Sequence, residues 1–452
     1  LLKETRGRSP AAAWLSEAGV ILALVVVVLG LAVVATNTLR PPRPNFAMPH
    51  PPELLVADFV FMQLDQASTQ VAGLAIELVT DLELFQTIDV AYAGERSDNA
   101  TPDDAYALGG IIRSEGGQLR VTASLRLGEG DNALWADTVT MPESAVDRSV
   151  DDISQAFAQD LGSRRGPLHK NALLALVAFE SLAGLESDYV CELLFGLWRD
   201  TQARPEMTRA SACIDGLLAR QPDSARALAM SAAMATEQLL YELGGVPEQQ
   251  ATWDGIEAQF ASAIRLAPTS GFVWELYGRY LELRGSSEAA ENAYSSSLQL
   301  NPANLDAKAE YGRMLVMSGQ SEHGVQLARD ALLGEAGTAP PWYHVALAVQ
   351  ALREGDDVQA MLQASLVERS DTELASVIAT VAARRQNAET ALNRSLSQLL
   401  EVTRFKRFGI LPVVRQRIKD PALMQTITAG LVAAGVTEEQ LNRGIGGEPV
   451  SP

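Results

Sequence analysis

Hydrophobic and polar positions change their spacing along the chain and divide it into three regions. Residues 18–35 carry no polar side chain. Between residues 53 and 165, short apolar runs and strictly alternating stretches are typical of strands, with helix-like spacing between them. Between residues 169 and 436, apolar residues recur at the spacing of helix faces. The pattern predicts an apolar span, then an α/β domain, then an all-α region.

The apolar span predicts a transmembrane helix over residues 18–36. Eighteen consecutive apolar residues would form about 27 Å of helix at ~1.5 Å per residue, just enough to cross a bilayer core. A cleaved signal peptide is the alternative, because residues 33–35 could serve as a small-residue cleavage site. Apolar runs in signal peptides are usually shorter, which favours the anchor. Residues 1–17 would then be a cytoplasmic stub.

Residues 37–52 are rich in proline and predict an extended linker. Six prolines fall between Thr38 and Pro52. Proline has no N–H to donate to a helix or a sheet, and proline-rich linkers act as semi-rigid spacers.

The α/β domain is predicted over residues 53–165. Two of its strands are joined through Gly116 and Gly117, a pair typical of a hairpin turn. The order of the elements predicts a small mixed sheet with its helices on one side. The predicted strands are 54–61, 87–91, 107–113, 119–127 and 132–140, and the predicted helices are 71–84 and 150–161.

A repeat of 34 residues runs through the all-α region. Leu266-Ala-Pro268 and Leu300-Asn-Pro302 are 34 residues apart, and so are Tyr277-Gly278 and Tyr311-Gly312. This period, with two helices in each unit, is the signature of tetratricopeptide repeats. We therefore predict a helical solenoid over residues 169–436, followed by a disordered tail over residues 437–452.

The repeat residues are predicted to pack the helices together. Small residues should allow paired helices to approach closely, aromatic residues should fill the gaps between units, and a proline should end the second helix. The predicted packing residues are Trp274, Tyr277, Gly278, Leu281, Ala290, Tyr294, Pro302, Tyr311 and Gly312.

The net charge of the chain and its lack of catalytic motifs indicate a binding function. The formal net charge is −20, and an acidic body repels phosphates, so nucleic acid binding is not expected. No phosphate loop, nucleophile elbow or paired-cysteine metal motif is present. The four histidines share no helical spacing. We therefore expect no catalytic residues, no metal and no cofactor.

The two cysteines, Cys191 and Cys213, are 22 residues apart. Two antiparallel helices joined near Ala203 to Glu206 would place the two cysteines side by side at the same distance from the turn. A disulfide is then expected in an oxidising compartment. The alternative is that both are small buried hydrophobic residues.

Several segments together resemble a known domain combination. They are residues 73–82, 106–113, 133–136, 340–344, 353–356, 420–423 and 430–435. The set resembles the TolB-like amino-terminal domain joined to tetratricopeptide repeats in bacterial membrane-anchored regulators of the winged-helix or adenylate cyclase type. One departure is Val56-Ala-Asp-Phe59, where that domain often has a proline in its first strand.

This resemblance implies an extracytoplasmic sensory or protein-interaction module of a bacterial signalling or transcriptional regulator. The chain is expected in the bacterial inner membrane as a single-pass protein, held by residues 18–36, with its bulk in the periplasm. The partner is expected to be a protein or a peptide bound through the helical repeats. A non-signalling envelope scaffold is the alternative, and a homodimer remains open.

Overall fold

A computed structural model describes residues 49–443, apart from short internal gaps. These gaps are residues 63–72, 96–101, 103, 129, 131, 143–145, 179–183, 244–249, 336 and 369. The predicted cytoplasmic stub, the predicted transmembrane helix over residues 18–36 and most of the predicted linker lie outside the described residues. Residues 48–452 form one compact unit.

The predicted fold class and localisation are corrected on one point. In the described part of the chain, no helix is both long enough and apolar enough to cross a membrane. The helices there are short. The longest of them, α7 (Ala225–Leu243), has 19 residues and includes Arg226, Glu237 and Glu242. The single transmembrane helix, the contact with the inner membrane and the single-pass inner-membrane location are therefore not retained. The fold class is a small mixed α/β domain followed by a helical array.

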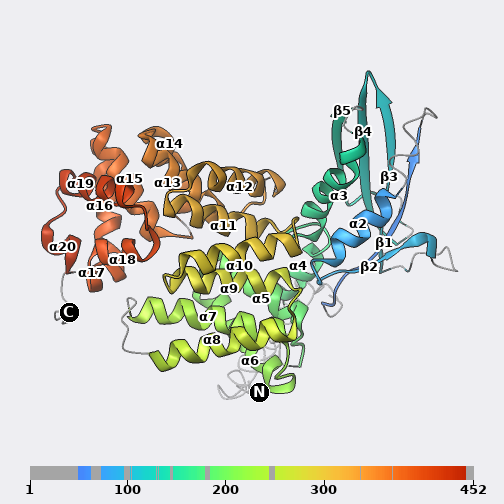
Figure 1. The fold of residues 1–452 in the computed structure, drawn as a ribbon, viewed down its shortest axis with the longest axis horizontal. Coiled ribbons are helices and arrows are strands. Elements are labelled where there is room, and N and C mark those ends of the chain that lie inside the picture. The colour runs from blue at the N-terminus through green and yellow to red at the C-terminus, as the bar shows by residue number, and fades with distance from the viewer. Residues whose placement is uncertain are drawn as a thin grey trace, which may run out of the picture. The chain divides into compact units, whose positions relative to one another are not determined.

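The α/β domain contains five strands and two long helices (Figure 1). In chain order its elements are β1 (Glu53–Phe61), α2 (Leu74–Glu83), β2 (Asp89–Tyr92), the 3-10 helix η2 (Ala93–Glu95), β3 (Tyr106–Glu115), β4 (Gln118–Leu127), β5 (Trp135–Pro142) and α3 (Val146–Gly162). The strand order in the sheet is β2-β1-β3-β4-β5. β1 runs parallel to β2 and β3, and β3, β4 and β5 are antiparallel neighbours.

One face of this sheet carries the core of the domain. Alternate residues of β4 point to the face covered by α2 and α3, so Leu119, Val121, Ala123 and Leu125 are buried. Phe157 of α3 is buried in the same cluster. Because successive side chains of a strand point to opposite faces, the polar residues between the buried ones leave the other face of the sheet exposed to solvent.

The β3–β4 hairpin turns at Gly116 and Gly117. Both residues have positive φ, 62° and 79°. Glycine reaches this region without steric cost, and two such residues form the turn that matches strand twist.

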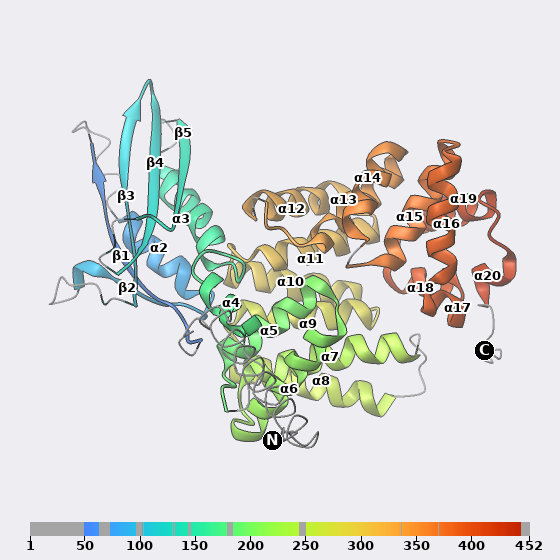
Figure 2. The ribbon, with the colours of Figure 1, turned by 180° about the vertical axis from the view of Figure 1, so that it is seen from behind.

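The helical array runs from α4 to α20 (Figures 1 and 2). Its elements are α4 (Lys170–Ala178), α5 (Asp188–Thr201), α6 (Arg204–Arg220), α7, α8 (Gln250–Leu266), α9 (Gly271–Leu283), α10 (Ser287–Leu300), α11 (Leu305–Ser318), α12 (Ser321–Gly334), the 3-10 helix η5 (Pro341–His344), α13 (Val345–Glu354), α14 (Asp357–Val367), α15 (Thr372–Arg385), α16 (Glu389–Glu401), α17 (Thr403–Phe408), α18 (Ile410–Arg417), α19 (Pro421–Ala433) and α20 (Glu438–Asn442).

From α5 to α16, consecutive helices pack as antiparallel pairs. The first helices of neighbouring pairs also contact each other, as α5 does with α7 and α11 with α13. Side-chain caps begin several of these helices, with Asn304 bonding the N–H of Ala307 and Asp371 bonding that of Leu374. Such caps satisfy N–H groups that have no partner inside the helix. Stacked two-helix units are the architecture of a tetratricopeptide-type solenoid.

The segment predicted as a disordered tail begins with a short helix. In α20, Thr437 and Gln440 form a reciprocal capping box, and Leu441 is buried. Residues 444–452 lie outside the described residues.

Candidate binding groove of the helical array

The first helices of the pairs line a cavity of about 690 Å³. Its walls come mainly from α5, α7, α9 and α11, and its rim from the ends of α15, α16, α17 and α18. Among the second helices, α6 contributes Arg204 and Met207 and α16 contributes Glu401, whereas α8, α10, α12 and α14 contribute none of the lining residues. We call this cavity the groove.

One wall of the groove is aromatic and apolar. Phe195 and Trp198 of α5 pack edge to face, with ring centroids 5.5 Å apart. Tyr280 of α9 and Trp342 of η5 add further aromatic surface. The guanidinium of Arg199 lies 5.3 Å from the ring centre of Trp342, a cation–π distance.

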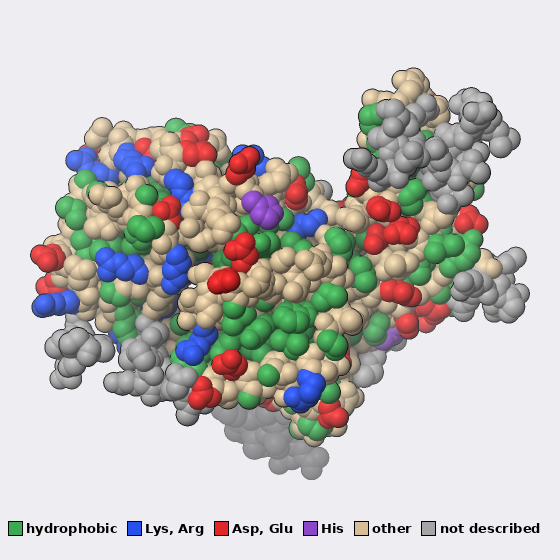
Figure 3. Space-filling model, viewed as in Figure 1, with side chains coloured by type: hydrophobic (Ala, Val, Ile, Leu, Met, Phe, Trp, Pro, Cys, Tyr) green, Lys and Arg blue, Asp and Glu red, His purple; other side chains and the backbone are tan. Residues whose placement is uncertain are grey.

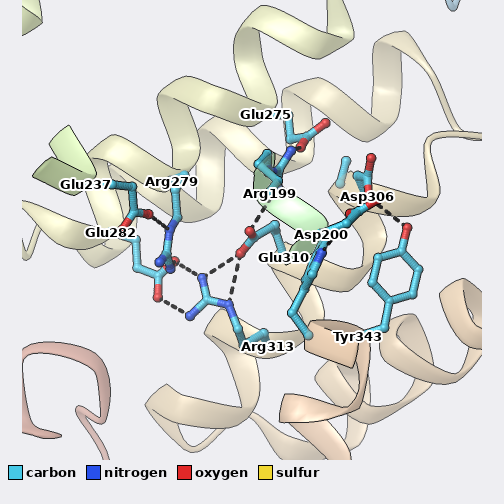
Figure 4. A network of polar contacts seen from close by, with 12 residues as sticks. Arg199, Asp200, Glu237, Glu275, Arg279, Glu282, Asp306, Glu310, Arg313 and Tyr343 are labelled. Atoms are coloured by element: carbon cyan, nitrogen blue, oxygen red, sulfur yellow. Dashed lines mark hydrogen bonds and ion pairs between the residues drawn. The ribbon is translucent and has the colours of Figure 1, made fainter. Parts of the chain in front are cut away.

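Arg313 is the centre of a buried ion network along another wall (Figure 4). Its side chain is only 4% exposed. Its Nη1 donates to Glu282 at 2.8 Å, and its Nε and Nη2 donate to Glu310 at 2.9 and 2.7 Å. Arg279 joins the same network and donates to Glu237 at 3.0 Å. Arg313 therefore ties α11 to α9 through Glu282, while Glu310 holds its guanidinium from within α11.

Arg199 extends the network to α5. It donates to Glu275 at 2.5 Å and to Glu310 at 3.0 Å. Asn304 donates to the other oxygen of Glu275 at 2.9 Å. Three first helices are thereby joined through charged hydrogen bonds, which are about twice as strong as neutral ones.

The network continues to the end of the α/β domain. Arg165, just after α3, donates to Asp200 at 2.6 and 2.8 Å, to Asp306 at 3.0 Å and to Glu335 at 2.9 Å. The hydroxyl of Tyr343 donates to Asp306 at 2.9 Å. Because Asp200 follows Arg199 directly, the α/β domain and the groove wall share one chain of ion pairs.

The electrostatics keep most of this network charged. Burial alone would raise the pKa of Glu310, but Arg313, Arg279 and Arg199 hold it at about 2. Burial likewise opposes ionisation of Glu282, and the charges of Arg313 and Arg279 lower its pKa all the same. The pKa of Glu275 is raised, because burial there outweighs the attraction of Arg199. The walls thus present fixed charges, which cost desolvation energy and specify geometry more than they stabilise the fold.

The rim of the groove carries side chains that face solvent. Arg204, Gln238, Thr372 and Thr403 are exposed lining residues. Arg204 has no ion pair with any carboxylate in the described part of the chain. These side chains are available to a ligand without disturbing the buried network.

The repeat residues that the sequence singles out lie between helices and do not line the groove. Tyr294, Ala290 and Leu281 are buried. Tyr277 stacks on Tyr280, and Tyr294 on Tyr311, with centroids 5.9 and 5.8 Å apart. The remaining predicted residues have structural contacts: Trp274 donates its indole N–H to the carbonyl of Pro268, Pro302 lies half-buried in the turn before α11, and Gly278 faces the ring of Tyr294.

Cys191 and Cys213 are joined in a disulfide between α5 and α6, with a Cα–Cα distance of 5.4 Å. Both side chains are buried. The bond fixes the first helix pair directly behind the aromatic wall of the groove.

Gly312 lies where α11 and α12 approach closely, and we expect its replacement by alanine to destabilise the fold. A Cβ there would lie 2.6 Å from the carbonyl oxygen of Gly324 and 2.9 Å from the nitrogen of Ala328, both backbone atoms. Gly312→Ala should therefore cost about 1–3 kcal/mol by overpacking. Gly255→Ala on α8 is the control, because a Cβ there meets no atom within 4 Å, and it should stabilise by about 0.5–1 kcal/mol. Equal unfolding midpoints in urea for the two variants would contradict this packing.

The charged groove residues are the functional candidates that sequence reasoning missed. A signal for them exists on the first helices. Glu275, Arg279 and Glu282 are spaced by four and three residues, as are Asp306, Glu310 and Arg313. Charges at this spacing share one helix face, and Arg279 and Arg313 are 34 residues apart, the period of the repeat.

The described residues offer no metal site. No group of three or more His, Cys, Asp or Glu side chains in that part of the chain could hold a metal ion. His169 is fully buried, contacts the hydroxyl of Tyr189 at 3.0 Å, and burial lowers its pKa to about 4. It is therefore a neutral core residue at physiological pH.

Comparisons with known proteins do not identify a family for the chain. No family model and no curated protein matches the chain. A solved structure, described as the crystal structure of the APC/C hetero-tetramer Cut9–Hcn1, is similar with a TM-score of 0.40 and 13% sequence identity. The match covers 66% of this chain and 62% of that chain, so this chain spans less than two thirds of that protein's length.

Proposed function

We propose that the chain is a protein-interaction module that holds a segment of a partner protein in the groove. The groove itself carries this proposal. It is a cavity of about 690 Å³ on the side formed by the first helices, which is the concave side of such solenoids. Its mixture of aromatic surface and fixed charges is typical of surfaces that anchor a few side chains of a bound segment.

The α/β domain is proposed to have a sensory or docking role, as the TolB-like resemblance implies. The chain of ion pairs from Arg165 to Arg313 supports a role coupled to the groove, because the two parts share Asp200, Asp306 and Glu335. A partner bound beside Arg199 would contact the same network that holds the end of α3. This proposal makes the chain the interaction part of a regulator.

Peptide selection with a groove-blocking variant tests the proposal. We would select binders to the full chain from a phage-displayed library of random peptides and measure their affinity by fluorescence anisotropy. Gln238 is an exposed lining residue, so Gln238→Trp should fill the groove without touching the core. We expect it to weaken binding at least about tenfold, equivalent to about 1.4 kcal/mol.

Gln299→Trp is the matched control, because Gln299 is an exposed residue of α10, a helix that contributes nothing to the groove. It should leave the affinity unchanged. Selected peptides that bind both variants as tightly as the natural chain, or a library that yields no binder sensitive to Gln238→Trp, would refute the groove as the binding site.

A further inference from the structure

Charge is distributed very unevenly along this acidic chain. Residues 384–420 contain nine lysines and arginines but only three acidic residues. Residues 53–165 contain twenty acidic residues but only seven lysines and arginines. On the face seen in Figure 3, red side chains gather over α2 and α3, and blue ones over the C-terminal helices. One end of the described chain is therefore basic and the other strongly acidic.

The basic end presents cations beside an apolar depression. Arg415 and Lys419 are exposed, and they line a shallow hollow with Ile418, Pro421 and Met424. Neither cation forms an ion pair with a carboxylate of the described residues, whereas their neighbour Arg417 is paired with Asp371 at 2.5 Å. We call Arg415, Lys419, Pro421 and Met424 the basic face.

The acidic end has a matching surface between α2 and α3. Glu77 of α2 is half-buried and Asp151 of α3 is exposed, and burial together with the charges of Asp81 and Asp151 raises the pKa of Glu77. Asp81 lies beneath them, buried, and accepts a hydrogen bond from the hydroxyl of Ser154. No arginine or lysine of the described residues forms an ion pair with these carboxylates. Ile76 lies next to them and is 57% exposed. We call Ile76, Glu77 and Asp151 the acidic face.

We propose that the basic face of one copy docks on the acidic face of a second copy. Each face has an exposed apolar side chain beside uncompensated charge, and the two signs are opposite. Docking places cations against carboxylates that otherwise repel one another, and it covers Ile76 and Met424 together. Because the two faces are different surfaces, the contact is heterologous and joins copies head to tail.

This association is separate from the proposed groove function and has its own signature. Sedimentation velocity should show wild-type chains that associate reversibly at low salt, with a sedimentation coefficient that rises with protein concentration. The association should be lost at about 0.5 M salt, because exposed charges are screened over a few ångströms there. Gln238→Trp should associate like the wild type, so failure of one proposal is distinguishable from failure of the other.

A charge-swap experiment tests which surfaces meet. The basic-face variant Arg415→Glu/Lys419→Glu and the acidic-face variant Glu77→Lys/Asp151→Lys should each be monomeric. An equimolar mixture should associate again, because the unchanged faces are complementary and the two reversed faces are complementary to each other. Arg120→Glu/Arg126→Glu on the exposed face of β4 makes the same change in net charge as the basic-face variant and should associate like the wild type.

Three results would overturn the proposal. The first is a wild type that stays monomeric at all concentrations, and the second is association that survives either charge reversal. The third is a monomeric chain that sediments with vesicles containing phosphatidylserine and loses this binding in Arg415→Glu/Lys419→Glu. That outcome would assign the basic face to an anionic membrane surface.

Discussion

Arg313→Met is expected to lower the free energy of unfolding by about 3–5 kcal/mol, the largest effect we predict for one side chain. The guanidinium is 4% exposed and is shared by Glu282 and Glu310. Methionine fills a similar volume but leaves two buried carboxylates without their main partner, and a buried charge without a partner is far more costly than a buried pair. Urea unfolding followed by circular dichroism measures the loss.

An exposed ion pair is the matched control for this variant. Arg394 is 71% exposed and pairs with Glu368 at 3.3 Å. Arg394→Met should therefore cost less than about 1 kcal/mol. If Arg313→Met were no more harmful than Arg394→Met, the network would not be buried as described. Addition of Glu282→Gln to Arg313→Met should recover part of the stability, because it removes one of the stranded charges.

Loss of the disulfide is the second large expected effect, at about 3 kcal/mol. Cys191 and Cys213 close a loop of 22 residues, and loop-closure entropy gives about 3 kcal/mol for a loop of this length. The variant Cys191→Ala/Cys213→Ala should unfold at a lower urea concentration, and dithiothreitol should lower the midpoint of the wild type by a similar amount.

The double variant also provides the control for the reductant. Dithiothreitol should leave the midpoint of Cys191→Ala/Cys213→Ala unchanged, because this variant has no disulfide to reduce. A wild type whose unfolding midpoint is the same with and without reductant, under conditions that release free thiols, would contradict a stabilising bond between α5 and α6.

The repeat could be predicted from the sequence because it depends on the spacing of residues that are close along the chain. Tyr277-Gly278 and Tyr311-Gly312 recur after 34 residues, and each forms contacts inside its own helix pair or with the next pair. The strands of the sheet could be predicted for a similar reason. Residues 119–127 alternate strictly, and β4 covers Gln118–Leu127. Local periodicity reports directly which face of an element is buried.

The groove and the ion network beside it could not be predicted from the sequence, because their residues are brought together from distant parts of the chain. Arg199 meets Glu275 and Glu310, which follow it by 76 and 111 residues. Arg165 meets Glu335 over 170 residues. Charged residues on a helix normally indicate a solvated face, so each of these positions taken singly predicts exposure. Only the stacking of three or more first helices buries them together.

The correction to the fold class has a different reason. The membrane anchor was predicted from the apolar run of residues 18–35, which lies outside the described residues, whereas the described helices bury one face against one another and none is long and apolar enough to cross a membrane. Amphipathic helices of this kind build a solenoid with one wall available to a partner.

Hydrogen–deuterium exchange with a selected peptide tests the central claim most directly. The full chain would be compared with and without saturating peptide. We expect slower exchange in α7, α9 and the segment that includes Thr403, which line the groove, and no change in α8, α10 and α12, which do not. Protection confined to α8, α10 and α12, or to the α/β sheet, would contradict the groove as the site where this protein holds its partner.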